Sequence, residues 1–290
     1  MATRRNKPDD ADVRRVGRTS PALRKSVTAR VRACSLERFE KRLAVRIRER
    51  ELREEVLRPL FRVIESDPAA MTAVEGLRNL VRDHARAGET LQRFSHEWGG
   101  PSSFDLAPGN HVFNPPFDLQ DAKADRWCSA DAQLNGSLTV DAGSADARGA
   151  RSAFASVSIV LQPAADGTLE VRPWINYTIR WTVGGTLLSA HSEGHVGTVA
   201  VDDNYHEIGR HDVTLWYCES EDSHGEDESY WVPPVGNTLQ RFAVRAGHQY
   251  TVAVYALVWI DQSGPRYTGS SYATGRLVAT VPLFGATLSR

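Results

Sequence analysis

The sequence predicts an α+β protein in which a basic arm and a helical segment precede an antiparallel β-sandwich of jelly-roll type. Apolar residues recur at helical spacing before about residue 98 and alternate with polar residues after it. The charge changes sign at the same place: residues 1–98 hold 23 Lys and Arg against 15 Asp and Glu, and residues 99–290 hold 12 against 21. All seven Trp lie from Trp98 onward. We therefore expect an arm over residues 1–19, helices over 20–98 and a sandwich over 99–290.

The first two parts follow from polarity and helix start signals. Residues 1–19 are polar and charged, which predicts a flexible basic arm. Ser20 and Pro21 favour a helix start, Ser35 a restart, and Asp67-Pro68 the start of another helix. Between these signals, apolar residues recur at helical spacing: Leu23, Val27, Val31 and Cys34, then Phe39, Leu43, Ile47, Leu52, Val56, Leu60 and Ile64.

A long two-stranded coiled coil is disfavoured in the helical segment. Heptads counted from Leu36 and Phe39 arrive at Arg46, Arg50 and Arg53, where a coiled coil needs apolar residues. The sequence instead predicts a helical hairpin that packs on itself or on a partner. We interpret the three Arg residues as a basic surface that meets acidic residues of a neighbouring subunit.

Strands are predicted by period-2 alternation. Residues 169–183 alternate between apolar and polar residues, apart from Pro173 and Trp174, and predict a long strand with one buried and one solvated face. Residues 250–260 are apolar at both parities and predict a central strand that is covered on both sides. Further runs at 153–161, 213–217 and 277–283 are separated by turn signals and not by helices. This arrangement is typical of an antiparallel sandwich.

The most specific candidate for chemistry is the row His191, Glu193 and His195. In an extended strand these three side chains point to one face, and two imidazoles with one carboxylate form a ligand set for Zn or Fe. A metal-dependent jelly-roll enzyme is therefore one alternative. In the other interpretation the row simply faces water, and Gly194 bends the strand. We expect no cofactor, with Zn or Fe at this row as the alternative.

An acidic loop is predicted over residues 219–229. Its carboxylates include Glu221, Asp222, Glu226 and Asp227, which could meet a basic surface of a neighbouring subunit or bind Ca²⁺. The loop lacks the alternating Asp spacing of a dedicated calcium loop, so a solvated or protein-contacting loop is the main expectation.

Two aromatic residues are candidates for a ligand or protein surface. Trp174 lies between Arg172 and Asn176 on the polar face of its strand. Trp216 lies two residues after Thr214, so in a regular strand both side chains point to the same face. Exposed aromatic residues on a sheet can stack on sugar rings or anchor a protein interface. The alternative is that both tryptophans belong to the core.

The sequence predicts a non-catalytic structural or binding protein that associates with itself or with another protein. No phosphate loop, dinucleotide motif, nucleophile elbow or zinc-protease motif is present. The basic arm leaves a nucleic-acid-packaging shell protein as a further alternative, and carbohydrate is a further candidate ligand. Three Cys without a pairing pattern, no secretory signal and no apolar membrane span favour the cytoplasm.

Overall fold

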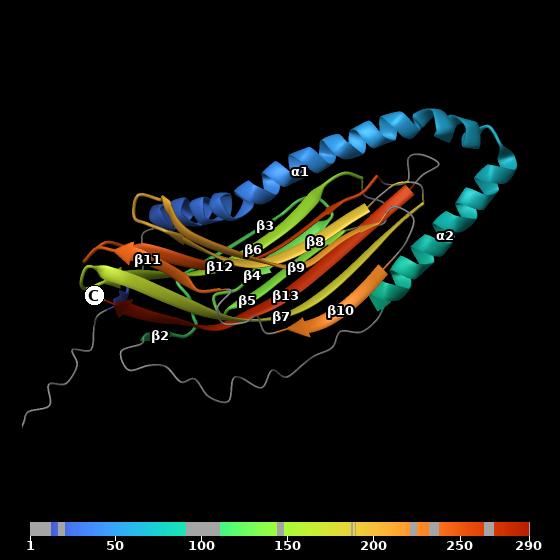
Figure 1. Ribbon diagram of the computed structural model, residues 1–290. Coiled ribbons are helices and arrows are strands. Elements are labelled where there is room, and N and C mark those ends of the chain that lie inside the picture. The colour runs from blue at the N-terminus through green and yellow to red at the C-terminus, as the bar shows by residue number, and fades with distance from the viewer. Residues whose placement is uncertain are drawn as a thin grey trace, which may run out of the picture.

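Two antiparallel sheets face each other in the computed structural model, and a long helix lies across the outer face of one of them (Figure 1). The structure describes residues 13–16, 21–90, 111–143, 148–186, 188, 190–220, 225–231, 238–263 and 270–289. Both the sandwich and the helical segment were predicted from the sequence, and the model confirms this fold class.

Sheet A has the strand order β1-β6-β12-β8-β9, and β3 also pairs with β6. Its strands are β1 (Val13–Arg15), β3 (Leu119–Ala124), β6 (Arg151–Pro163), β8 (Ala190–Val201), β9 (Glu207–Ser220) and β12 (Tyr250–Asp261). The predicted central strand is β12, which pairs with β6 on one side and with β8 on the other. Every residue of β8 and β12 is buried, so this part of sheet A is covered on both faces.

Sheet B has the strand order β10-β7-β13-β5-β4, with β11 also on β7 and β2 also on β13. Its strands are β2 (His111–Phe113), β4 (Cys128–Ala132), β5 (Ser137–Gly143), β7 (Gly167–Thr186), β10 (Gly225–Trp231), β11 (Gln240–Val244) and β13 (Ser270–Ser289). The alternating run at 169–183 lies within β7, whose odd-numbered residues fill the core between the sheets. The sheets meet through a core of aliphatic and aromatic residues that includes Ile159, Val254, Leu277 and Phe284.

Two helices precede the sandwich, α1 (Pro21–Glu65) and α2 (Pro68–Thr90). The first half of α1 packs on the outer face of sheet A: Val31 lies in a cluster with Ala253, and Phe39 lies in a cluster with Tyr255 and Leu257. These contacts explain why β12 shows no alternation, since its even-numbered residues face sheet B and its odd-numbered ones face α1. Figure 1 shows α1 continuing past the sandwich before α2 turns back towards β10.

The structure differs from the expected elements in three places. The expected arm is held to the sandwich at Val13–Arg15, which pairs with β6. The expected helix restart at Ser35 is absent from α1, because the Ser35 hydroxyl donates to the Val31 carbonyl inside one continuous helix. Much of the segment expected as an acidic loop is strand, because β9 extends to Ser220 and β10 begins at Gly225. The expected boundary near residue 98 lies outside the described residues.

Candidate functional site

Four arginines of α1 face four carboxylates on the outer face of sheet A. Arg38, Arg42, Arg46 and Arg50 are four residues apart, which keeps them on one side of the helix. Their partners and the N–O distances are Asp212 (3.5 Å), Glu193 (2.9 Å), Glu219 (2.8 Å) and Asp261 (3.0 Å), in the same order. We call these eight residues the clasp, because they fix α1 over β8, β9 and β12.

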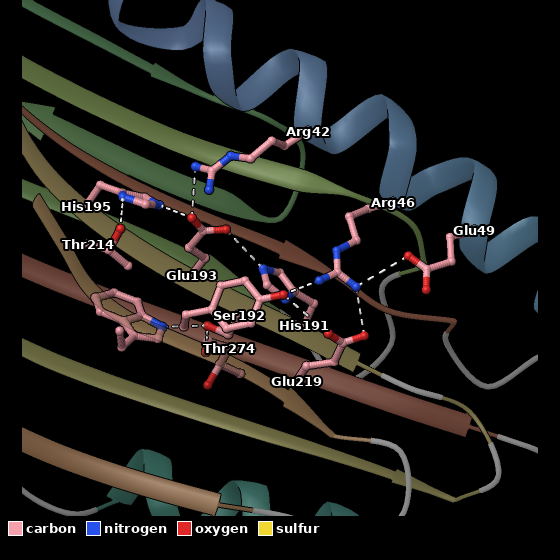
Figure 2. A network of polar contacts seen from close by, with 12 residues as sticks. Arg42, Arg46, Glu49, His191, Ser192, Glu193, His195, Thr214, Glu219 and Thr274 are labelled. Carbon is pink, nitrogen blue, oxygen red and sulfur yellow. Dashed lines mark hydrogen bonds and ion pairs between the residues drawn. The ribbon is translucent and has the colours of Figure 1, made fainter. Parts of the chain in front are cut away.

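The His191, Glu193 and His195 row lies at the centre of the clasp (Figure 2). Nε2 of His195 lies 2.5 Å from Oε1 of Glu193, and Nε2 of His191 lies 3.3 Å from Oε2. Only 1% of Glu193 is exposed, and both imidazoles are also buried. The structure thus places the three side chains on one face of the strand, as the strand period predicts. This face packs against α1 and is not exposed to solvent, in contrast to the alternative in which the row faces water.

Aromatic rings close the sides of this row. The Phe39 ring of α1 lies 4.4 Å from the His195 ring, and the Trp259 ring lies 4.2 Å from the His191 ring. Tyr217 packs edge-on against His191 at 4.8 Å. The row is therefore a buried polar cluster between aromatic rings and the arginines of the clasp, and its charges are balanced by these neighbours and not by water.

The surroundings set the charges in the row. Burial raises the pKa of the Glu193 carboxyl, but hydrogen bonds from His191 and His195 and the charge of Arg42 outweigh this and lower the pKa to about 2. Burial lowers the pKa of His195 below its ordinary 6.5, although the contact with Glu193 opposes the change. Burial also raises the pKa of Asp212 and of Asp261, against the charges of Arg210 and Arg50 respectively. At neutral pH the row is therefore an ionised Glu193 and a neutral His195 held against the Arg42 guanidinium.

The geometry does not support the alternative of a Zn or Fe centre at His191, Glu193 and His195. Among the described residues, no group of three His, Cys, Asp or Glu is arranged to hold a metal ion. The physical reason is that Nε2 of each imidazole is turned towards the Glu193 carboxylate, whose Oε1 also contacts the Arg42 guanidinium. A guanidinium cation at that oxygen opposes a second cation there.

Trp216 lies in the core and not on the surface, where it was one of two candidates for binding a ligand or a protein. It is 6% exposed, and its Nε1 donates to the Ser192 hydroxyl at 3.0 Å between the sheets. The strand register explains the error: Gly194 pairs with Trp216 but His195 pairs with Thr214, so a bulge puts Thr214 and Trp216 on opposite faces. A Cβ atom on Gly194 would lie 1.9 Å from the Trp216 ring, so only glycine leaves room for it.

The other aromatic candidate lies on the outer face of sheet B. Trp174 is half-buried, and its Nε1 donates to Oδ1 of Asn176 at 3.0 Å. Arg172 is exposed and pairs with Glu170, which also contacts Arg241 at 2.6 Å. The structure therefore brings Trp174, Arg172 and Asn176 to one face, but it separates them from Trp216.

The basic surface expected at Arg46, Arg50 and Arg53 is largely used within the chain. Arg46 and Arg50 belong to the clasp, and Arg53 contacts Glu49 of the same helix at 3.4 Å. Of their expected partners, Glu221 and Asp222 lie outside the described residues. Glu226 and Asp227 lie in β10, where they pair with Thr182 and Trp181 of β7.

Basic residues of the N-terminal part of the chain therefore form ion pairs with acidic residues of the sandwich in the same molecule. Besides the clasp, Arg15 contacts Asp118 at 2.7 Å and Arg32 contacts Asp121 at 3.0 Å. These two described arginines of the basic region are bound to the sandwich and not presented to a nucleic acid. The four-residue spacing of the α1 arginines was the available sequence signal for this arrangement, and the partners Asp212 and Asp261 were missed.

The opposite side of α1 carries aliphatic residues that remain in solvent. We call these five residues the stripe, and their exposed fractions range from 44% to 76%. Its members are Val45, Leu52, Val56, Leu60 and Val63. Aliphatic residues that line up on one exposed side of a helix mark an interaction site more often than scattered exposed residues do.

Comparisons with known proteins add no family to this picture. No family model and no curated protein matches the chain. Among solved structures, the chain is similar to the carbohydrate-binding module TmCBM61 in complex with beta-1,4-galactotriose, at 10% identity over 60% of this chain and 90% of that chain, with a TM-score of 0.20. It is also similar to a structure of infectious bursal disease virus, Gx strain, at 10% identity over 67% of this chain and 43% of that chain, with a TM-score of 0.22. Similarities at this level carry no argument about function.

A third neighbour is TmCBM27, a carbohydrate-binding module whose structure concerns mannan recognition. It shares 11% identity over 58% of this chain and 88% of that chain, with a TM-score of 0.18. Neither described helix is long and apolar enough to cross a membrane.

Proposed function

We propose that this protein is a non-enzymatic structural module that holds α1 rigidly on its sandwich and binds another protein with the outward side of that helix. The observation that carries the proposal is the stripe. Five large aliphatic side chains recur on one side of α1 and remain exposed, whereas the described strands of the sandwich bury most of their aliphatic residues. Leu77 and Leu80 of α2 are the other exposed large aliphatic residues of the described helices. Protein–protein contact is the usual way to cover a surface of this kind.

The clasp supports the proposal because it explains why the stripe stays exposed. An amphipathic helix on a folded domain normally turns its apolar side inward. Between Val45 and Leu52 the side of α1 that faces sheet A holds Arg46 and Arg50, and Arg50 is bound to both Asp261 and Glu54. Further along the helix, Phe61 is buried while Val56 and Val63 are exposed. Rolling the helix to bury the stripe would break these ion pairs and would leave buried carboxylates unpaired, which costs several kcal/mol. The apolar side is therefore held outward for a partner.

A rigid helix is also a favourable binding element. The cost of ordering a flexible segment on binding is avoided when the segment is already fixed in its bound conformation. The clasp fixes α1 through side chains from three strands, so the stripe is presented by a preorganised helix.

The proposal is tested by photo-crosslinking in the cells that make the protein. A photoreactive amino acid at Val56, in the middle of the stripe, should give a covalent adduct with a protein. The same amino acid at Ala44, which is exposed on α1 but lies outside the stripe, is the matched control and should give little or none. An absence of adducts at Val56, or equal adducts at both positions, would contradict the proposed function.

A further inference from the structure

We infer that the partner of the stripe is a second copy of this chain, bound antiparallel along α1. The inference rests on the proposed function and adds the identity and direction of the partner. Its basis is the spacing of the aliphatic residues, which matches itself when the helix is reversed.

Four of the five stripe residues follow a palindromic pattern. Val45, Leu52, Val56 and Val63 are separated by seven, four and seven residues. At 100° per residue these four side chains lie within about 40° of one another around the helix, over a length of about 27 Å. They therefore form a narrow seam along the curved helix, and Leu60 borders it on one side.

Reversal of a second helix brings an apolar residue opposite each of these four apolar residues. Leu52 then meets Val56 of the second copy, and Val45 meets its Val63. Each contact occurs twice, which is the property of an isologous two-fold interface. A chance arrangement of aliphatic residues would match a reversed copy of itself at only some positions.

The two remaining seam positions favour the antiparallel direction over the parallel one. Glu49 and Pro59 continue the seam at heptad spacing, between the aliphatic residues. In a parallel pair in register, the Glu49 carboxylates of the two copies would face each other and repel. In the antiparallel pair, Glu49 lies opposite Pro59 of the second copy and keeps its contacts with Arg46 and Arg53 of its own helix.

The sandwich leaves room for this contact. The clasp and the apolar residues around Phe39 lie on the side of α1 that faces sheet A, whereas the stripe is exposed. Figure 1 shows no other described element on the outer side of α1. Two copies can therefore join through their helices while each sandwich stays on the far side of its own helix.

Sedimentation of the full chain from low to high micromolar concentration tests the inference. Wild type should shift from monomer to dimer, and Val56→Glu should weaken the dimer by roughly tenfold or more. Ala44→Glu adds the same charge at an exposed position outside the stripe and should leave the dimer unchanged. A monomer at all concentrations, or a dimer that Val56→Glu leaves intact, would overturn the inference.

Disulfide trapping tests the direction. In a background with Cys128→Ser and Cys218→Ser, a mixture of Leu52→Cys and Val56→Cys chains should form the mixed disulfide far more readily than either chain alone forms a homodimer. Efficient homodimers of the single variants would indicate a parallel pair and overturn the antiparallel assignment.

The two proposals fail in different ways. A monomer in solution together with an adduct from Val56 to a different protein would reject the second copy and leave the proposed function standing. A monomer without any adduct would reject both.

Discussion

The two sides of α1 invert the usual arrangement of an amphipathic helix. From Arg42 to Arg50, charged residues face the domain and pair with the buried carboxylates Glu193 and Asp261, whereas Val45 between them faces solvent. In its first turns the same helix follows the ordinary pattern, with Val27 and Val31 buried against the sheet. The difference shows that the surface beneath a helix decides which of its sides is buried: apolar strands select apolar residues, and a row of carboxylates selects arginines.

The largest expected effect comes from the centre of the clasp. Glu193→Gln keeps the size of the side chain but removes the charge that holds Arg42 and the two imidazoles. The Arg42 side chain is half-exposed and can be hydrated once its partner is lost, so the expected cost is the stabilisation of the Glu193 charge itself, about 3 kcal/mol from a pKa of about 2 against 4.5. We expect a loss of this size in the free energy of unfolding, measured by urea denaturation. Glu37→Gln, which breaks a contact with Lys41 on the exposed side of the helix, is the control and should change little.

Acid should lower the free energy of unfolding in two steps, through His195 and Glu193 beneath α1. The pKa of His195 lies below 6.5 in the folded state, so the unfolded chain takes up the proton first and stability falls as the pH drops below about 6.5. Glu193 has a folded pKa of about 2 against 4.5, so the stability it contributes above pH 4.5, about 3 kcal/mol, is lost as the pH falls from 4.5 towards 2.

The raised pKa values of Asp212 and Asp261 act in the opposite sense. Their contribution to stability rises as the pH falls from their raised folded pKa values towards 3.8, so it partly offsets the losses from His195 and Glu193. Urea midpoints measured between neutral and mildly acidic pH should show the first step in wild type and its loss in His195→Gln. A first step that persists in the variant would assign it to another group.

The smallest expected effect on the free energy of unfolding comes from a substitution in the stripe, on the exposed side of α1. Val56→Glu should leave the free energy of unfolding of the dilute monomer within about 0.5 kcal/mol of wild type, since this side chain is 76% exposed. Its effect should be confined to association. A large loss of stability in the monomer would mean that the stripe is covered within the chain, and the contrast between the two sides of α1 would disappear.

Local periodicity predicted much of this molecule. The double coverage of β12 follows from apolar residues at both parities, and the shared face of His191, Glu193 and His195 follows from the period of a strand. The bulge between Thr214 and Trp216 could not be predicted, because it depends on the register of β9 against β8. The clasp could not be predicted either: Arg50 lies 211 residues from Asp261, so their contact depends on the complete topology of sheet A.

The clasp also has a consequence for the order of events during folding. Its arginines leave the ribosome long before their partners, since Arg46 precedes Glu219 by 173 residues and the four carboxylates come from three strands of one sheet. We expect α1 to dock only after β8, β9 and β12 have paired, because the acidic surface does not exist before then. In pulse-labelled refolding, the amides of β12 should gain protection before the clasp forms, and the reverse order would contradict this. During synthesis the helix would meanwhile expose both its unpaired arginines and its aliphatic stripe, which makes the nascent chain the state most exposed to premature association.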